Sequence, residues 1–382
     1  MLKNKIYKYI TIEFTKSFLT ILFALTAIAW TVRAVSFLDL IVENGHSVIT
    51  YLQFSTLNLT NIITKFIPLS FLLSLVLTII KFEKQNELII LWTSGVNKIK
   101  LVNLFFLISL LVLAFQLLFA SIITPSSLNK SRSLIRVSDF NSISTIIKSN
   151  DFSDSFKNIT FYTEKKNSLN EMENVFIRDE NNTFKNIISN QEDSSNTTII
   201  AEKGFISNKK LLLMNGIIQT QNKYGKISNI NFTKTELSID ALKPRTITKP
   251  KLQETTTFAL ISCFLKDEST VLLKFLNSCP SKKINKDIIS TVLRRIGMPL
   301  YIPLVALLCC FLLISTKKRK YRYMQNYIYF FLGFVVLVCA EILVRYSGFS
   351  KLNSFLYFTV PLFLMPIVYF ILLKKLNREK KI

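Results

Sequence analysis

Glycine is scarce in this chain, accounting for eight of its 382 residues. None of the eight belongs to a GxxxxGK[ST] loop, so the chain has no P-loop to cradle a nucleotide phosphate. Histidine is rarer still, because His46 is the only one, and no group of His, Cys or carboxylate residues has metal-ligand spacing. The sequence also lacks paired carboxylates that would indicate a hydrolase. We therefore predict no enzyme activity in this chain, no metal and no cofactor.

Acidic residues are outnumbered two to one. The chain holds 48 Lys and Arg against 24 Asp and Glu, a formal net charge of +24. The basic residues cluster at the ends of apolar segments and do not form a stripe interleaved with stacking aromatics, the pattern that binds nucleic acid. Nucleic acid is therefore excluded as a partner.

Long apolar runs are what the sequence has in abundance. Half of the residues are hydrophobic, and Phe alone contributes 32. A hydrocarbon core of about 30 Å requires about 20 apolar residues per helix. Six segments meet this requirement, namely 17–37, 57–80, 101–123, 298–315, 327–345 and 355–373. The sequence predicts a polytopic α-helical membrane protein.

The distribution of basic residues predicts the orientation. Eighteen Lys and Arg lie in the ends and short loops at 1–16, 81–100, 316–323 and 374–382. The short loops 38–56 and 346–353 hold one, Lys351. Because positive residues favour the cytoplasmic side, both termini are predicted to be cytoplasmic, and residues 126–297 to lie on the opposite side.

The long insert contains an all-β pattern between about Ile159 and Ile239. Five runs with β-branched and aromatic residues alternate with Asn, Asp, Ser and Gly clusters: ITFYT, NVFIR, TTIIAEKGFIS, KLLLMNGIIQTQ and ISNINFTKTELSI. Such runs predict antiparallel strands of a sandwich or barrel, with turns at 167–173, 179–196 and 221–226.

After Pro244 and Pro250 the pattern becomes helical, which predicts a connector to the fourth apolar segment. Cys263 and Cys279 lie here and could pair in an oxidising space, although spacing alone does not decide this. The remaining cysteines, Cys309, Cys310 and Cys339, lie in apolar segments as small fillers.

The loop between the second and third apolar segments predicts a short amphipathic helix at 83–95. Leu88, Leu91 and Trp92 fall at helical spacing on one side, and Gly95 suits the position that ends a helix. Asn97 then suits the N-cap of the next helix. Such a helix either lies in the lipid headgroups or docks into a groove of a cytoplasmic partner.

Five motifs occur in an order that resembles the LptF/LptG permeases, which export lipopolysaccharide from the inner membrane of Gram-negative bacteria. They are KYITIE at 8–13, IPLSFLL at 67–73, EL with a following glycine at 87–95, TP at 124–125 and LRRIGMPL at 293–300. The first resembles the family's (R/K)-Y-(I/L)-x-x-E entry motif, and the fourth is placed like the proline that closes the third span. The last departs from the family's pattern, because Thr291 stands where an acidic residue is usual. The strand runs at 158–163 and 174–178 look more like LptF.

This resemblance implies a function for the loop helix. In the family it is a coupling helix seated on an ATPase dimer, and its glutamate, here Glu87, contacts that partner. Leu88, Leu91, Trp92 and Gly95 would complete the docking element, although Trp92 stands where the family often has Arg. The resemblance further implies a β-jellyroll in the insert, a paralogous permease subunit, a membrane-anchored jellyroll protein and lipopolysaccharide as cargo.

Several basic residues lie near the predicted external ends of the spans: Arg33, Lys65, Arg132, Arg136, Arg294, Arg295 and Arg345. A charged residue inside a span is costly, so we predict that several of these residues bind the phosphates of lipid A. The alternative is that their long side chains reach out to the interface. For Arg345 the alternative is stronger, because Glu341 lies four residues earlier and can pair with it.

The predicted organisation has four parts. Residues 1–125 carry three spans and the coupling helix, 126–250 form the periplasmic β-jellyroll domain with its linker, 251–297 connect, and 298–382 carry three more spans and a cytoplasmic tail. The predicted function is the permease subunit of an ATP-driven lipopolysaccharide extractor. Two alternatives stay open: a permease for another lipid, lipoprotein or peptide, which would usually have four spans, and a receptor or scaffold that transports nothing.

Overall fold

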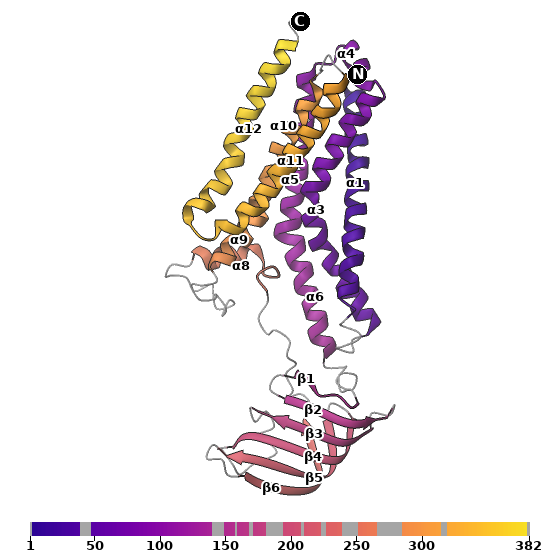
Figure 1. The fold of residues 1–382 in the computed structure, drawn as a ribbon, viewed down its shortest axis with the longest axis vertical. Coiled ribbons are helices and arrows are strands. Elements are labelled where there is room, and N and C mark those ends of the chain that lie inside the picture. Colours follow the sequence, from indigo (N-terminus) through magenta and orange to yellow (C-terminus); the bar gives the residue numbers. More distant parts are fainter. Residues whose placement is uncertain are drawn as a thin grey trace. The chain divides into compact units, whose positions relative to one another are not determined.

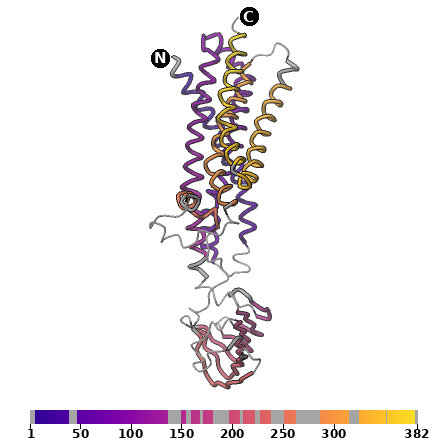
Figure 2. The backbone as a smooth tube through the Cα atoms, turned by 90° about the vertical axis from the view of Figure 1, so that its left-hand side faces the viewer, coloured from indigo at the N-terminus to yellow at the C-terminus, as the bar shows by residue number. Residues whose placement is uncertain are grey.

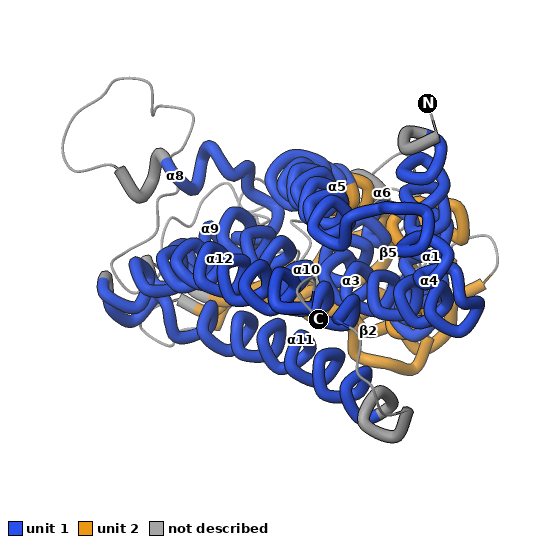
Figure 3. Tube along the Cα trace, turned by 90° about the horizontal axis from the view of Figure 1, so that it is seen from above, with its two compact units in different colours: residues 1–33, 56–130, 249–382 blue, residues 34–55, 131–248 orange. Residues whose placement is uncertain are grey.

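The chain forms two compact units in a computed structural model. The first contains Met1–Arg33, Thr56–Lys130 and Lys249–Ile382, and the second contains Ala34–Ser55 and Ser131–Thr248 (Figure 3). The structure describes residues 2–38, 47–139, 149–156, 159–167, 171–180, 194–207, 210–222, 227–238, 251–265, 285–314 and 319–379. Cys279 and His46 lie outside these residues, as does the side chain of Cys263, so the disulfide stays a prediction.

Helices dominate the chain before and after the insert. The first group is α1 (Leu2–Ser36), α3 (Val48–Lys84), α4 (Glu87–Thr93), α5 (Lys98–Leu118), the π-helical turn η1 (Phe119–Ile123) and α6 (Thr124–Asp139). The second is α8 (Thr257–Leu265), α9 (Asn285–Ile296), η6 (Met298–Leu300), α10 (Tyr301–Cys309), η7 (Cys310–Leu313), α11 (Arg319–Ser347) and α12 (Lys351–Glu379). The last two form a hairpin (Figures 1 and 2).

Among the described residues, six helical stretches are long and apolar enough to cross a membrane, and each overlaps one of the predicted spans. They are Lys5–Ser36, Val48–Lys84, Lys98–Ile135, Lys286–Leu313, Met324–Ser347 and Leu352–Glu379. The fold class of six membrane-spanning helices with an inserted all-β domain is therefore confirmed.

The core of the helical unit is centred on α10. Nearly every residue of this helix is buried, including Tyr301, Val305 and Cys309. By contrast, α12 exposes large apolar residues such as Phe363. Such faces suit contact with lipid tails or with another membrane subunit.

One narrow stripe holds α1 against this core. Every fourth residue from Ile10 through Phe14, Phe18 and Leu22 to Thr26 is buried, while the residues between them are mostly exposed. The rings of Phe14 and Phe71 meet edge to face at 5.6 Å between centroids, which fastens the stripe to α3.

Pro125 does not close the third span, contrary to the sequence expectation. The helix continues through it to Asp139, after the π-helical turn η1. A proline cannot donate to the carbonyl four residues earlier, which here belongs to Ser121. The hydroxyl of Thr257 donates a hydrogen bond to that carbonyl oxygen at 2.9 Å. The acceptor freed by the proline is thus satisfied from α8, and the helix does not have to end.

The second unit holds one antiparallel sheet whose six described strands follow in sequence order (Figures 1 and 2). They are β1 (Ser153–Phe156), β2 (Ile159–Lys166), β3 (Glu171–Asp179), β4 (Ser194–Ser207), β5 (Lys210–Asn222) and β6 (Ile227–Ser238). The five predicted strands are present, and β3, β4 and β5 extend into the predicted turns. The sequence SDSF of β1 was missed because it lacks the apolar alternation of a half-buried strand.

Two strands of this sheet contain an asparagine with an unusual backbone conformation. Asn174 in β3 and Asn215 in β5 have φ angles of 51° and 52°, a left-handed conformation that non-glycine residues seldom adopt. Both are skipped in the pairing with β4, and the residue pairs on either side keep the same register, so neither strand gains an extra residue. Their carboxamides donate to the carboxylates of Glu164 and Glu202, respectively.

Candidate functional site

The loop helix α4 is bounded by two residues with positive φ. Asn86, at 58°, separates it from α3, so the predicted helix at 83–95 is shorter and begins at Glu87. Gly95, at 78°, follows its end. The Gly95 N–H donates to Trp92 O and the Val96 N–H to Leu91 O, both at 3.1 Å, which completes a Schellman motif. The predicted glycine stop is confirmed.

The next helix begins as the sequence predicts. The Asn97 side-chain oxygen accepts a hydrogen bond from the Ile99 N–H at 3.1 Å, the geometry of an N-cap. Lys98 then binds Glu379 at the end of α12, with 2.7 Å between the charged atoms. The end of α12, the start of α1 and α4 all lie at one end of the helical unit (Figure 1).

The apolar side of α4 faces the protein's own core. Leu88 is buried, and Leu91 and Trp92 pack half-buried against the same cluster. In this structure Leu88 is therefore not accessible to a partner. The exposed apolar residues of α4 are instead Ile89 and Ile90, which expose 58% and 62% of their surfaces.

Glu87 is bound within its own chain. Its Oε1 accepts a hydrogen bond at 3.1 Å from the Tyr9 hydroxyl of α1. Tyr9 belongs to the KYITIE motif at 8–13, for which the sequence predicted no role. The two motifs are thus in direct contact.

A cavity of about 480 Å³ lies between α3, α5, α9 and α11 in the helical unit. One part of its wall is apolar, with Leu69, Met298 and Phe334 among the lining residues. Another part carries charge. Four of the seven predicted basic residues line it, namely Lys65, Arg294, Arg295 and Arg345.

Within the cavity, Glu341 pairs with a different arginine from the one expected. Its Oε1 lies 2.6 Å from Arg294 Nη2 on α9, and the structure shows no such contact to Arg345 one turn along α11. The expected Glu341–Arg345 pair is therefore wrong, because a neighbouring helix supplies a closer cation. Arg345 is exposed on the cavity wall.

Arg295 has a structural role. It is only 7% exposed, and its guanidinium donates to the carbonyl oxygens of Leu252, Gln253 and Thr255 and to the Thr257 hydroxyl, at 2.9 to 3.2 Å. These bonds use both terminal nitrogens. The side chain therefore ties α9 to the segment before α8, and it has little donor capacity left for a lipid phosphate.

The remaining basic candidates are dispersed. Arg33 is exposed near the end of α1, and Lys65 lies within electrostatic range of Arg33, Arg294 and Glu341. Arg132 lies half-buried on α6. Arg136 is in the same helix, but its side chain falls outside the described residues.

Polar residues inside the spans complete the cavity, and the sequence reading missed them. Gln116 is 97% buried in α5, lines the cavity, and its Oε1 has no hydrogen-bond partner in the described chain. Nearby, the hydroxyls of Thr64 and Thr124 bond to each other at 2.8 Å. A glutamine in the apolar run LVLAFQLLFA was the available signal, because amides are costly there unless paired.

The sheet has an apolar hollow of its own. A groove of about 500 Å³ runs along one face across β2 to β5. Phe152, Tyr162, Phe176, Ile200 and Ile217 line it, and Phe152 and Ile200 are more than half exposed. The opposite face forms the buried core of this unit, with Ile177 paired to Ile199.

Comparison with known proteins covers nearly the whole chain. The family model described as "Lipopolysaccharide export system permease LptF/LptG" matches residues 8–375. A curated relative, the uncharacterized protein RP871 of Rickettsia prowazekii (strain Madrid E), is 28% identical over 177 residues. That match covers 46% of this chain and 48% of the relative, so it spans about half the length of the relative.

Proposed function

Because the chain belongs to the lipopolysaccharide export system permease family LptF/LptG, we propose that it is the permease subunit of an ATP-driven transporter that extracts lipopolysaccharide from the inner membrane. Both termini are cytoplasmic in this proposal, and residues 126–297 are periplasmic. The family model treats the two paralogues together, so the closer likeness to LptF stays a prediction.

The observation that carries the proposal is the mixed chemistry of the cavity between α3, α5, α9 and α11. Lys65 and Arg345 supply positive charge beside a wall formed by residues such as Leu69 and Phe334. Lipid A joins phosphates to several acyl chains, so it requires cations and apolar surface in one place. Arginine suits the phosphate because its donors bind two oxygens at once.

The groove on the sheet supports a second step. An acyl chain that leaves the membrane must keep its apolar surface away from water. The exposed side chains of Phe152 and Ile200 offer such a surface outside the spans. In the proposal, lipid passes along this face to a membrane-anchored protein with a matching jellyroll.

The energy comes from a partner in this proposal. An ATPase dimer docks at α4, where Ile89 and Ile90 are exposed and Glu87 stands at the first turn. A paralogous permease covers part of the exposed apolar surface of the spans. Six candidate spans disfavour the alternative class of permease with four.

Photo-crosslinking tests the cargo. A photoreactive amino acid at Val338, on the cavity wall, should capture lipopolysaccharide in cells, whereas the same residue at Phe363, exposed on α12, should not. Substituting Lys65→Glu together with Arg345→Glu should remove most of the crosslink. Equal capture at both positions, or capture that the substitutions leave unchanged, would rule out the cavity as the lipid site.

Co-purification tests whether an ATPase binds the chain. The chain should bring down an ATPase, and Glu87→Ala should weaken that association while the protein still reaches the membrane. A receptor or scaffold would bring down no ATPase.

A further inference from the structure

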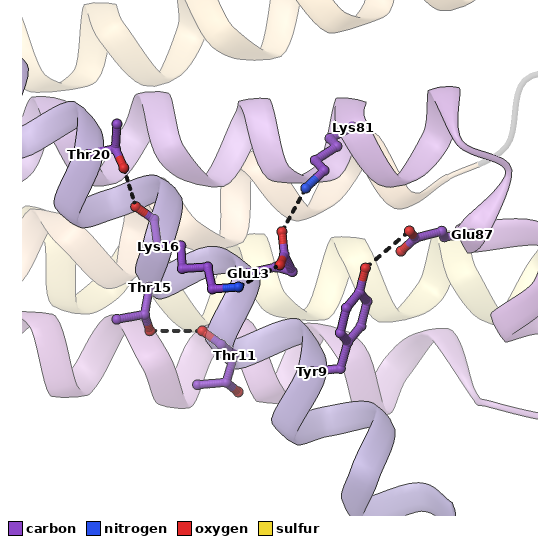
Figure 4. A network of polar contacts seen from close by, with 8 residues as sticks. All are labelled: Tyr9, Thr11, Glu13, Thr15, Lys16, Thr20, Lys81 and Glu87. Atoms are coloured by element: carbon purple, nitrogen blue, oxygen red, sulfur yellow. Dashed lines mark hydrogen bonds and ion pairs between the residues drawn. The ribbon is translucent and has the colours of Figure 1, made fainter.

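The start of α1 is joined to the loop helix α4 by a hydrogen bond and to the end of α3 by a ring contact. Besides donating to Glu87, Tyr9 stacks its ring on Phe82 near the end of α3, with 6.1 Å between centroids. Figure 4 shows the Tyr9 side chain reaching from α1 toward the Glu87 carboxylate.

A second contact lies one turn further along α1. Glu13 Oε2 is 2.6 Å from Lys81 Nζ on α3, and its other oxygen is 3.4 Å from Lys16 in the same helix (Figure 4). Lys81 and Glu87 lie on opposite sides of the left-handed turn at Asn86. The two contacts therefore attach α1 both to α3, before the turn, and to α4, after it.

Next to these contacts, α1 and α3 are separated by a groove. It measures about 410 Å³, and Ser17, Thr20, Leu77 and Thr78 line it together with Glu13, Lys16 and Lys81. The Glu13–Lys81 pair spans this groove beside the buried contact of Phe14 with Phe71. The polar contacts therefore add to the apolar packing of Ile10 and Phe14 at this end of α1.

We propose that the Tyr9–Glu87 and Glu13–Lys81 contacts form a clamp that makes α1 follow displacements of α4. Tyr9 and Glu13 are then positioning residues of the transport cycle. This inference rests on the proposed function, in which the ATPase pushes on α4.

The turn at Asn86 explains why a clamp is needed. Since α4 joins α3 through a single left-handed residue, a push on α4 could be absorbed by rotation at that turn. Besides the packing of Leu88 into the core, the bond from Tyr9 attaches α4 directly to α1. A carboxylate accepts hydrogen bonds at both oxygens, so Glu87 can hold Tyr9 and a cationic group of the partner together.

The movement of α1 is the direct test. Spin labels at Val32 and Ile342, both exposed, would report the distance between α1 and α11 in the complex with its ATPase in nanodiscs. Serine would first replace Cys263, Cys279 and Cys339, so that none of these thiols takes a label. We expect trapped nucleotide to shift this distance in the wild type. The double variant Tyr9→Phe, Glu13→Gln should lose the shift and release about fivefold less lipopolysaccharide per ATP, the low end of typical coupling between sites.

Lys16→Gln is the matched control. It removes an ion pair to the same carboxylate, but one made within α1, so both the shift and the transport should stay at wild-type level. Exchanging the charges with Glu13→Lys and Lys81→Glu should restore what either single substitution loses.

Two results would overturn the clamp. If the double variant keeps its ATPase and shows the wild-type distance shift, α1 moves without Tyr9 and Glu13, and the proposed function stands unharmed. If the wild-type chain binds no ATPase at all, the proposed function fails and the clamp fails with it.

Discussion

Arg294 and Glu341 join two helices across the wall of the cavity, with 2.6 Å between Nη2 and Oε1. The pair removes one positive charge from a site that otherwise carries Lys65 and Arg345. Both side chains are more than 40% exposed, so the pair itself contributes at most about 1 kcal/mol to folding. Its main effect is on the charge of the cavity.

Glu341→Gln should therefore tighten the binding of lipopolysaccharide. The substitution frees the Arg294 guanidinium for a phosphate, and one added charge-assisted contact gives about a tenfold lower Kd. Equilibrium binding in nanodiscs at two salt concentrations measures this, with the largest gain at low salt. Glu341→Asp, which keeps the charge, is the control. Equal affinities in the wild type and both variants would show that the charge of the cavity does not affect lipopolysaccharide binding.

Arg295→Met should lower stability. The change leaves three partly buried carbonyl oxygens without these donors, which costs about 3 kcal/mol in all. Thermal unfolding in detergent should show a clear fall in Tm. Arg345→Gln is the matched control, because that side chain is exposed and its removal should leave the Tm nearly unchanged; similar losses in both variants would contradict the structural role of Arg295.

Thr257→Val should cost about 1 kcal/mol, because the Ser121 carbonyl freed by Pro125 loses its donor. In a Pro125→Ala background the restored N–H can donate to that carbonyl itself. Thr257→Val should then cost less, and a double-mutant cycle of unfolding free energies measures the difference. Equal costs in both backgrounds would show that the hydroxyl does not replace the helical bond.

Ile90→Asp should weaken binding of the ATPase at least about tenfold, because it places a charge on the exposed apolar surface of α4. Its Tm should stay unchanged. Leu88→Ala should instead lower the free energy of unfolding by about 2 to 3 kcal/mol, because it leaves a cavity in the core. Pull-down of the ATPase together with thermal unfolding distinguishes docking from packing, and an Ile90→Asp protein with full ATPase binding would place the partner elsewhere.

Gly216→Ala should destabilise the sheet by about 2 kcal/mol through overpacking. A Cβ at this position would run into the Ile200 carbonyl oxygen and lie 2.6 Å from the Phe232 ring. At Gly204 the nearest atoms are side-chain ends at 3.0 Å and beyond, so Gly204→Ala should cost less. Hydrogen exchange of the strand amides compares the two, and a larger loss at Gly204 would contradict this account.

Local signals predicted local structure well. Apolar runs located all six candidate spans, and the Gly95 stop and Asn97 cap followed from side chains that act on their own backbone. The end of the third span was predicted less well, because it depends on a contact between residues far apart in the sequence. Pro125 was predicted to close a span, but the helix continues because the hydroxyl of Thr257, more than a hundred residues away, donates to the Ser121 carbonyl.

The candidate site was less predictable, because it depends on which surfaces meet. Periodicity located an apolar side on α4 but could not show that Leu88 would be covered by the protein's own core. The i,i+4 spacing favoured Arg345 as the partner of Glu341, although Arg294 on another helix lies closer. Only the assembled helices decide between such partners.

The buried stripe on α1 fixes how this helix meets its neighbours. Steps of four residues advance about 40° beyond a full turn each time, so the contact line from Ile10 to Thr26 winds around the helix. A helix with such a line crosses its neighbours obliquely and has one point of closest approach. If α1 tilts about that point, its two ends move in opposite directions. An inward displacement near Tyr9 would then move the end that carries Arg33 outward.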